Sequence, residues 1–141
     1  MSNRRDFMKK GFAVVAGLTV LPLVSAKAAE KVAANPQAHL AGIIYTTENQ
    51  GKWAGKAKGH APVVKVEGKQ VTITTNHGMS EKHFIVRHTL VTASGEVIGE
   101  KTFSYNDEKA ISVFTLPEGQ HQFYATSFCN KHDLWMTGFS V

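Results

Sequence analysis

Hydrophobic and polar residues alternate with a period of two along most of the chain from Pro62 onward. This alternation is typical of β-strands that bury one face. Turn-forming residues divide the alternating segments: Gly68–Lys69 and Ser94–Gly95 each predict a hairpin, and the Pro-Glu-Gly stretch at 117–119 predicts a turn. The pattern predicts a short first strand at 43–47 and seven further strands at 63–67, 70–75, 83–92, 96–103, 110–116, 121–128 and 134–141.

The number and spacing of these strands predict the fold class. About seven short strands within roughly 100 residues, with turns about every 8 to 12 residues, favour an immunoglobulin-like antiparallel β-sandwich. No segment of this region has a helical periodicity. The chain has 141 residues, 43% of them hydrophobic, which is enough for one globular core. We therefore expect a single all-β domain over residues 29–141.

Residues 1–28 have the three-part pattern of a secretory signal. Residues 1–10 are basic and polar, 11–24 are apolar, and 25–28 (Ser-Ala-Lys-Ala) offer small residues for cleavage. The apolar stretch of about 14 residues is shorter than the roughly 20 residues of a membrane-spanning helix. We expect a signal peptide at 1–28, a mature chain that starts near Ala29, and no stable membrane anchor.

The basic part of this signal resembles a known export motif. Residues 3–9 read Asn-Arg-Arg-Asp-Phe-Met-Lys, which is similar to the twin-arginine motif. That pathway exports proteins that are already folded, often with a cofactor inserted. The resemblance implies a periplasmic location in a bacterial cell envelope and a metal that is loaded before export.

The net charge argues against nucleic acid as a partner. The chain carries +5, but residues 1–28 hold five basic residues and one acidic residue, which is +4 of that total. The remaining 11 basic and 10 acidic residues leave the body at +1. A nearly neutral body lacks the positive surface that a polyanion requires.

The residues with metal-binding chemistry are one cysteine and several histidines. Cys129 and His132 are three positions apart, and a turn between them would bring both side chains onto one ion. His77 and His83 are six positions apart in a stretch whose Gly78 and Ser80 allow the chain to fold back, and His60 precedes the next strand. A single cysteine excludes a disulfide or a four-thiolate site within one chain. In a cell envelope its sulfur is better protected on a metal, although a buried structural cysteine is the alternative.

Three stretches of the chain resemble the iron centre of the superoxide reductase family (neelaredoxins and desulfoferrodoxins). The family patterns are Glu-Lys-His-x-Pro, His-Pro-Met-x-x-Glu-His and Cys-Asn-x-His-Gly-x-Trp. The matching stretches are Lys-Gly-His-Ala-Pro at 58–62, His-Gly-Met-Ser-Glu-Lys-His at 77–83 and Cys-Asn-Lys-His-Asp-Leu-Trp at 129–135. The resemblance runs from about Gly51 to Trp135. It also implies an immunoglobulin-like sandwich, in agreement with the strand pattern.

The resemblance implies one non-haem iron per chain and an enzyme that reduces superoxide to hydrogen peroxide. The ligands carried over from the family are four histidines in a plane and an axial cysteine thiolate: His60, His77, His83, His132 and Cys129. The electron donor is not identified by the sequence, and a homo-oligomer is possible. A second, rubredoxin-type iron centre would need four more cysteines than the chain has.

The chain departs from the family pattern at residues beside the proposed ligands. The family Glu has no counterpart, because its position is taken by Lys58 or, with Gly59 as an insertion, by Ala57. Gly78 replaces the Pro after the second histidine, and Asp133 replaces the Gly after the last one. Lys58 is the candidate catalytic residue, because its ammonium group would attract the superoxide anion toward the iron.

Two other functions fit part of the pattern. Cys129, His132 and Met136, with an upstream histidine such as His77, also resemble the copper loop of cupredoxins, which are envelope electron carriers. A metal-free immunoglobulin-like module that uses Cys129 as a thiol is the third possibility. The first of these leaves two histidines of the candidate set unexplained. Three further histidines are expected to lie away from any metal: His39, His88 and His121.

Overall fold

The structure is a computed structural model that describes residues 40–141. The predicted signal peptide and twin-arginine motif, the predicted start of the mature chain and His39 lie outside these residues. Within the described part of the chain, no helix is long and apolar enough to cross a membrane.

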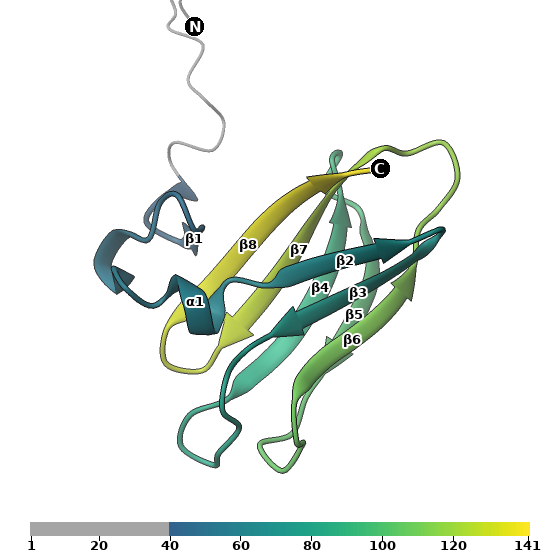
Figure 1. Ribbon diagram of the computed structural model, residues 1–141. Helices are drawn as coiled ribbons and strands as arrows, with labels where there is room; N and C mark the ends of the chain where they lie inside the picture. The colour runs from purple at the N-terminus through teal and green to yellow at the C-terminus, as the bar shows by residue number, and fades with distance from the viewer. Residues whose placement is uncertain (1–39) are drawn as a thin grey trace, which may run out of the picture. The chain divides into compact units, whose positions relative to one another are not determined.

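Eight strands form two sheets that pack face to face, as Figure 1 shows. The larger sheet has the order β1-β8-β7-β4-β5 and the smaller one β2-β3-β6. The strands are β1 (Ile44–Tyr45), β2 (Val63–Glu67), β3 (Gln70–Thr75), β4 (Ile85–Thr92), β5 (Val97–Thr102), β6 (Ala110–Thr115), β7 (Gln122–Cys129) and β8 (Asp133–Ser140). All pairs are antiparallel except β1 with β8. The predicted all-β sandwich is confirmed.

The core lies between the sheets and is made by alternate residues of facing strands. Val71 and Ile73 of β3 pack against Leu90 of β4 and Phe123 and Ala125 of β7, and all five are fully buried. Their alternation with exposed neighbours follows from the two-residue period of a strand. The hydrophobic pattern of the sequence thus placed the inward face of these strands correctly.

The sandwich is tight where β5 passes β6. A Cβ atom on Gly99 would come within 2.4 Å of the Phe114 ring, so a side chain at this position would displace the ring. Glycine therefore lets the edge strand β5 approach the aromatic side chain of β6.

A buried polar network joins the two sheets. The His88 ring of β4 is hydrogen-bonded to Thr75 Oγ1 of β3 at 2.8 Å and to Ser112 Oγ of β6 at 2.9 Å. Thr75 also donates to Ser127 of β7. Burial, with a smaller effect of the Lys101 ammonium, lowers the pKa of His88 from 6.5 to about 4. His88 is therefore a neutral histidine of the core.

We expect acid to destabilise the fold through His88. The unfolded chain takes up a proton near pH 6.5, whereas the folded chain does so only near pH 4. The stability contributed by neutral His88 is thus present above pH 6.5 and is lost as the pH falls toward 4, by about 3 kcal/mol in total. Urea unfolding of metal-free protein at pH 7 and 4.5, compared with His88→Gln, would measure this. An equal loss of stability in both proteins would contradict the assignment to His88.

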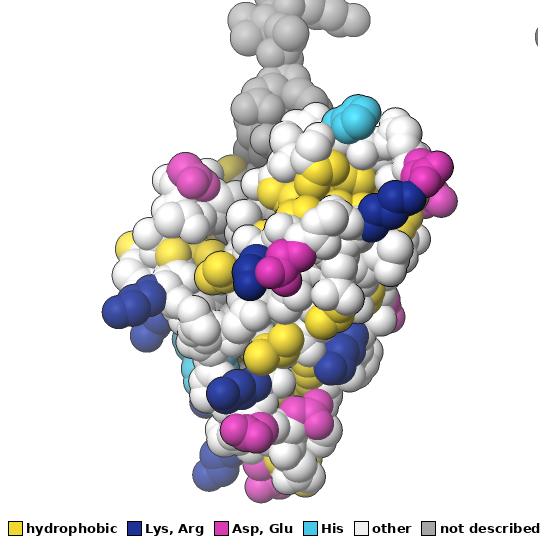
Figure 2. Space-filling model, turned by 45° about the vertical axis from the view of Figure 1, so that its right-hand side comes forward, with side chains coloured by type: hydrophobic (Ala, Val, Ile, Leu, Met, Phe, Trp, Pro, Cys, Tyr) yellow, Lys and Arg dark blue, Asp and Glu magenta, His cyan; other side chains and the backbone are white. Residues whose placement is uncertain are grey.

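Charged side chains are dispersed over one face of the sandwich. On the face in Figure 2, basic and acidic side chains alternate and form no continuous patch of either sign. This agrees with the small net charge that the sequence gives for the body.

The structure corrects several predicted boundaries. The 3-10 helix Gly51–Trp53 and helix α1 (Ala57–His60) were not predicted, because a single turn is too short to produce a helical periodicity. Strand β4 begins at Ile85 rather than at His83, so His83 lies in a loop. Cys129 is the last residue of β7 and Asp133 the first of β8, which leaves only three residues between these strands.

Three connections meet at one end of the sandwich. Helix α1 precedes β2, the loop after β3 leads to β4, and the short turn after β7 leads to β8; Figure 1 shows them near one another. They carry the candidate metal ligands.

Candidate metal centre

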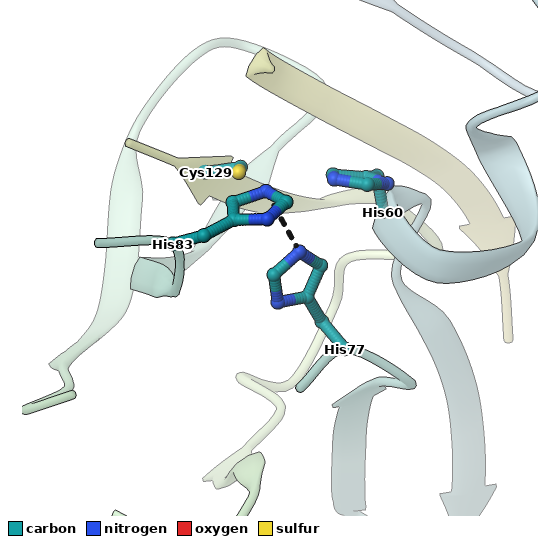
Figure 3. A group of neighbouring side chains, drawn as sticks. All are labelled: His60, His77, His83 and Cys129. Atoms are coloured by element: carbon teal, nitrogen blue, oxygen red, sulfur yellow. Dashed lines mark hydrogen bonds between the residues drawn. The ribbon is translucent and has the colours of Figure 1, made fainter. Parts of the chain in front are cut away.

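Four of the five predicted metal ligands converge at this end of the sandwich. His60, His77, His83 and Cys129 each offer one ligand atom, and these atoms all lie within 4.8 Å of one another. Figure 3 shows that the three imidazole rings and the sulfur come from separate segments and point toward a common centre.

His132, which is not drawn in Figure 3, contacts the same cluster. Its Nδ1 atom lies 2.9 Å from His60 Nε2, 2.9 Å from His83 Nε2 and 3.8 Å from Cys129 Sγ. His83 Nε2 lies 3.1 Å from His77 Nε2. The nitrogens therefore follow one another in the order His60, His132, His83, His77.

The ring positions describe a square. Successive rings in this order have centroids 4.7, 4.7 and 4.3 Å apart, and His77 to His60 closes the cycle at 4.7 Å. The diagonal pair His60 and His83 is further apart, at 5.8 Å. A metal–imidazole bond of about 2.0–2.1 Å would place neighbouring ligand nitrogens about 3.0 Å apart in a square. The observed nitrogen contacts of 2.9–3.1 Å fit one ion.

The protonation of the rings also fits a cation. His60 Nδ1 lies 2.8 Å from the Lys56 carbonyl oxygen, and His77 Nδ1 contacts the Gly78 carbonyl oxygen, so each Nδ1 carries a proton and donates it. The Nε2 atoms of these neutral rings then have lone pairs directed at the centre. Lone pairs that face one another without protons are satisfied by a positive ion, and the carbonyl partners fix the ring orientation.

The electrostatics keep the imidazoles neutral. Removal from water is the largest cause of a lowered pKa at His60, His77 and His132. At His83 the same cause, with the neighbouring imidazoles, lowers the pKa to about 4. At neutral pH all four rings are therefore neutral, and each has one unprotonated ring nitrogen that can bind a metal.

Local backbone structure positions each histidine. His60 ends α1, and both Ala57 of this helix and Ala61 directly after it are buried in a cluster with Trp135 and Tyr45. His77 lies two residues after the end of β3, and its N–H donates to the Thr75 carbonyl oxygen.

His83 is held by a short turn and by the cysteine loop. Its N–H donates to the Ser80 carbonyl oxygen. The Asn130 side chain accepts from the Phe84 N–H at 3.0 Å and donates to the Lys82 carbonyl oxygen at 3.1 Å. Asn130 therefore fixes the turn after Cys129 against both neighbours of His83, a role that sequence analysis did not assign to it.

Cys129 lies beside the histidine cluster, at the end of β7. Its side chain is buried, and its backbone pairs with Asp133 across the β7–β8 turn. The Lys131 N–H points at the sulfur at 3.5 Å, which is the type of contact that stabilises a thiolate.

Asp133 and Trp53 are residues at the site whose roles sequence analysis did not predict. Asp133 has φ 61°, a left-handed conformation that favours glycine. Its Oδ2 atom accepts from Trp53 Nε1 at 2.9 Å and pairs with Lys52 Nζ at 2.9 Å, and these two donors lower the pKa of Asp133. The contact spans 80 residues, so no local pattern in the sequence could have indicated it.

The structure places the predicted catalytic residue Lys58 and two other lysines around α1 and the cysteine turn. Lys58 is exposed on α1 and lines a hollow of about 610 Å³ with Ala61, Pro62 and Val63, none of which is a candidate ligand. The positive charges that act on the cluster include those of Lys56, on His60 and His132, and Lys131, on His83 and His132.

The remaining residues of the sequence hypotheses lie elsewhere. His88 is in the core network, and His121 is exposed at the start of β7 with Nδ1 against the Val141 carbonyl oxygen. Met136 lines a groove on the larger sheet with Leu134 and Phe128, while its neighbour Trp135 faces inward. Met136 is therefore not placed as the axial ligand that a cupredoxin site would need.

The fold and the cluster define a β-sandwich protein with a histidine–cysteine metal centre. The family model described as Desulfoferrodoxin matches residues 50–138, which contain all five candidate ligands. The chain therefore belongs to the desulfoferrodoxin family and is a superoxide-reductase-like oxidoreductase. The cofactor of this family is one non-haem iron, and the cluster is able to hold a metal.

Solved structures support the fold. A superoxide reductase (neelaredoxin) from Ignicoccus hospitalis is 24% identical, with TM-score 0.59 over 70% of this chain and 93% of that one. The superoxide reductase (1Fe-SOR) from Giardia intestinalis is 21% identical, with TM-score 0.55 over 60% of this chain and 99% of that one. The superoxide reductase from Treponema pallidum is 29% identical, with TM-score 0.51 over 60% of this chain and 69% of that one. The comparison with curated sequences gave no match.

Proposed function

We propose that the chain binds one iron through His60, His77, His83, His132 and Cys129 and reduces superoxide to hydrogen peroxide. The observation that carries this proposal is the square of imidazole nitrogens, with a buried sulfur beside it, in a chain of the desulfoferrodoxin family. In the proposed reaction, one superoxide takes up one electron and two protons and leaves as hydrogen peroxide. A bound iron supplies the one-electron couple between its ferrous and ferric states.

The side chains of this chain would prepare the reaction. Neutral imidazoles leave the site with only one anionic candidate ligand, the Cys129 thiolate, which would supply electron density to a bound iron. The hydrogen bonds from His60 and His77 to backbone carbonyls hold the ring planes. The electrons would come from a separate donor, because one cysteine supplies no rubredoxin-type centre in the same chain.

Metal analysis and kinetics test this function together. Protein matured without chelator should contain about one iron per chain, and pulse radiolysis should show rapid consumption of superoxide without release of oxygen. One copper per chain would favour the cupredoxin alternative, which the family assignment does not favour. Protein that takes up neither metal would support a thiol module.

We propose that lysines around the candidate metal centre attract superoxide, with Lys58 of α1 as one of them. The body is nearly neutral, so capture of a small anion depends on local charge. Lys58→Ala should lower the second-order rate and flatten its dependence on ionic strength, because one screened attraction is lost. Lys56→Ala should have a larger effect, roughly two- to threefold at low salt, since its charge acts directly on His60 and His132.

Measuring the iron content distinguishes a loss of electrostatic attraction for superoxide from the loss of a metal ligand. The iron content should be unchanged in both variants, and Lys65→Ala, on the exposed face of β2, serves as a control for net charge. Identical rates and salt slopes for Lys58→Ala and wild type would make Lys58 an ordinary surface residue.

We propose a periplasmic location reached through the twin-arginine pathway. The support is the arginine pair at positions 4 and 5 followed by the apolar segment 11–24. Replacing Arg4 and Arg5 together by Lys should retain the protein in the cytoplasm, as fractionation would show. Undiminished export of that variant would contradict the proposal.

A further inference from the structure

Asp133 occupies a strained position and is bonded to a segment far away in the sequence. It directly follows His132, and its φ of 61° lies in the left-handed region, which glycine adopts freely and Asp or Asn only at a small cost. Its Oδ2 atom accepts two hydrogen bonds, from Trp53 Nε1 and from Lys52 Nζ, each at 2.9 Å. A strained backbone that is retained together with such contacts points to a specific role for the side chain.

The contacts of Trp53 show what the Asp133 carboxylate holds in place. The Trp53 ring packs edge-on against the His132 ring, with centroids 4.7 Å apart. The backbone of His132 is fixed separately, because its carbonyl oxygen accepts from Trp135 Nε1 at 2.9 Å. The imidazole of His132 is thus restrained by Trp53, and Trp53 is restrained by Asp133.

The two hydrogen bonds that Asp133 accepts differ in strength. The pair with Lys52 is solvent-exposed, with 61% and 43% of the two side chains accessible, and exposed pairs contribute little. The bond from the Trp53 indole is partly buried and is accepted by a charged oxygen, which makes it the stronger of the two. The carboxylate should therefore act mainly through Trp53.

The segment that contains Trp53 also contacts a second candidate ligand, His60. Gln50 Oε1 accepts from the Gly55 and Ala57 N–H groups, and the Lys56 carbonyl oxygen accepts from His60 Nδ1. The segment 50–57 therefore spans from His132 to His60 as one hydrogen-bonded unit. Because Asp133 binds Trp53 of this segment, the carboxylate is linked through the segment to both His132 and His60.

We propose that Asp133 is a positioning residue that holds Trp53 against His132 and thereby slows release of the metal. Loss of a metal requires a ligand ring to rotate away, and the Trp53 edge blocks that movement at His132. This inference rests on the proposed function only in taking His132 as a ligand. It assigns no part in electron or proton transfer to Asp133.

Substitutions at Asp133 can separate this role from a structural one. Asp133→Gly removes the carboxylate but also relieves the left-handed backbone, so the melting temperature should be unchanged or higher. The rate of iron loss from the reduced protein to excess ferrous chelator should nevertheless rise about tenfold. Asp133→Asn keeps an oxygen that accepts from the indole and tolerates the left-handed conformation, so its rate should be intermediate.

The matched variants test whether Asp133 acts through Trp53. Trp53→Phe keeps the ring edge on His132 but loses the indole donor, and it should release iron about as fast as Asp133→Gly. The double variant should be no faster than either single one, because both remove the same bond. Lys52→Ala should stay within about twofold of wild type.

A second readout does not depend on iron. In metal-free protein the Trp53 indole proton should exchange with solvent about tenfold faster in Asp133→Gly than in wild type, as NMR would show. Wild-type rates of iron loss and of indole exchange in Asp133→Gly, or rate effects that multiply in the double variant, would overturn the inference. A wild-type protein that binds no iron would instead overturn the proposed function, and the indole exchange would still decide the role of Asp133.

Discussion

Replacement of Cys129 by Ser is expected to abolish superoxide reduction almost completely. The hydroxyl of serine is not ionised near neutral pH and is a far weaker donor than a thiolate, so the electron density that supports the reaction is lost. Loss of residues that merely orient metal ligands costs roughly 10–100-fold, and loss of the proposed axial ligand itself should cost more than about 100-fold. Pulse radiolysis would measure the rate, and the absorption spectrum should lose any sulfur-to-iron charge-transfer band.

The fold should survive this substitution. Cys129 is buried with Ile85, Phe103 and Ala110, and serine has nearly the same volume. Far-UV circular dichroism of the variant should therefore match that of the wild type. A charge-transfer band that is unchanged in Cys129→Ser would place the chromophore on another group and contradict the assignment.

The second large effect is expected for His83→Ala, which should lower iron content to less than roughly a tenth of wild type. His83 Nε2 lies next to the ligand nitrogens of both His77 and His132, so its removal opens the square between them. The rings of His77 and His132 flank this gap from opposite sides and cannot close it. Elemental analysis and the visible spectrum of purified protein would check the result.

His121→Ala is the matched control for His83→Ala. His121 precedes β7, at the end of that strand opposite to Cys129, and its ring is exposed. Its removal should leave iron content and spectrum unchanged. Full iron occupancy in His83→Ala would exclude His83 as a ligand.

The strands were predictable because their signal is local. Val71 and Ile73 alternate with polar neighbours, and Gly68 has the positive φ that a two-residue hairpin turn requires. The parallel pairing of β1 with β8 could not be predicted, since it depends on where a two-residue strand meets the far end of the chain. Helix α1 is a single turn and has no periodicity to detect.

The candidate site was predictable to a similar degree. The spacings of His77 with His83 and of Cys129 with His132 can be read directly from the sequence. The structure brings these four residues and His60 together. Which nitrogen of His60 and of His77 faces the centre is set by hydrogen bonds to the carbonyl oxygens of nearby residues, and no motif states it. The contact of Trp53 with Asp133 arises only when the sandwich closes.

The wide separation of the converging side chains has a consequence for folding kinetics. His60 and His132 are in contact although they are 72 positions apart along the chain. Contacts between distant segments form slowly, because the entropy of closing a long loop is lost before they contribute. A metal ion that binds only the native arrangement of ligands stabilises the native state by mass action. It does not stabilise the partly folded chain, in which the ligands have not yet come together. We therefore expect iron to slow unfolding of this protein much more than it accelerates folding.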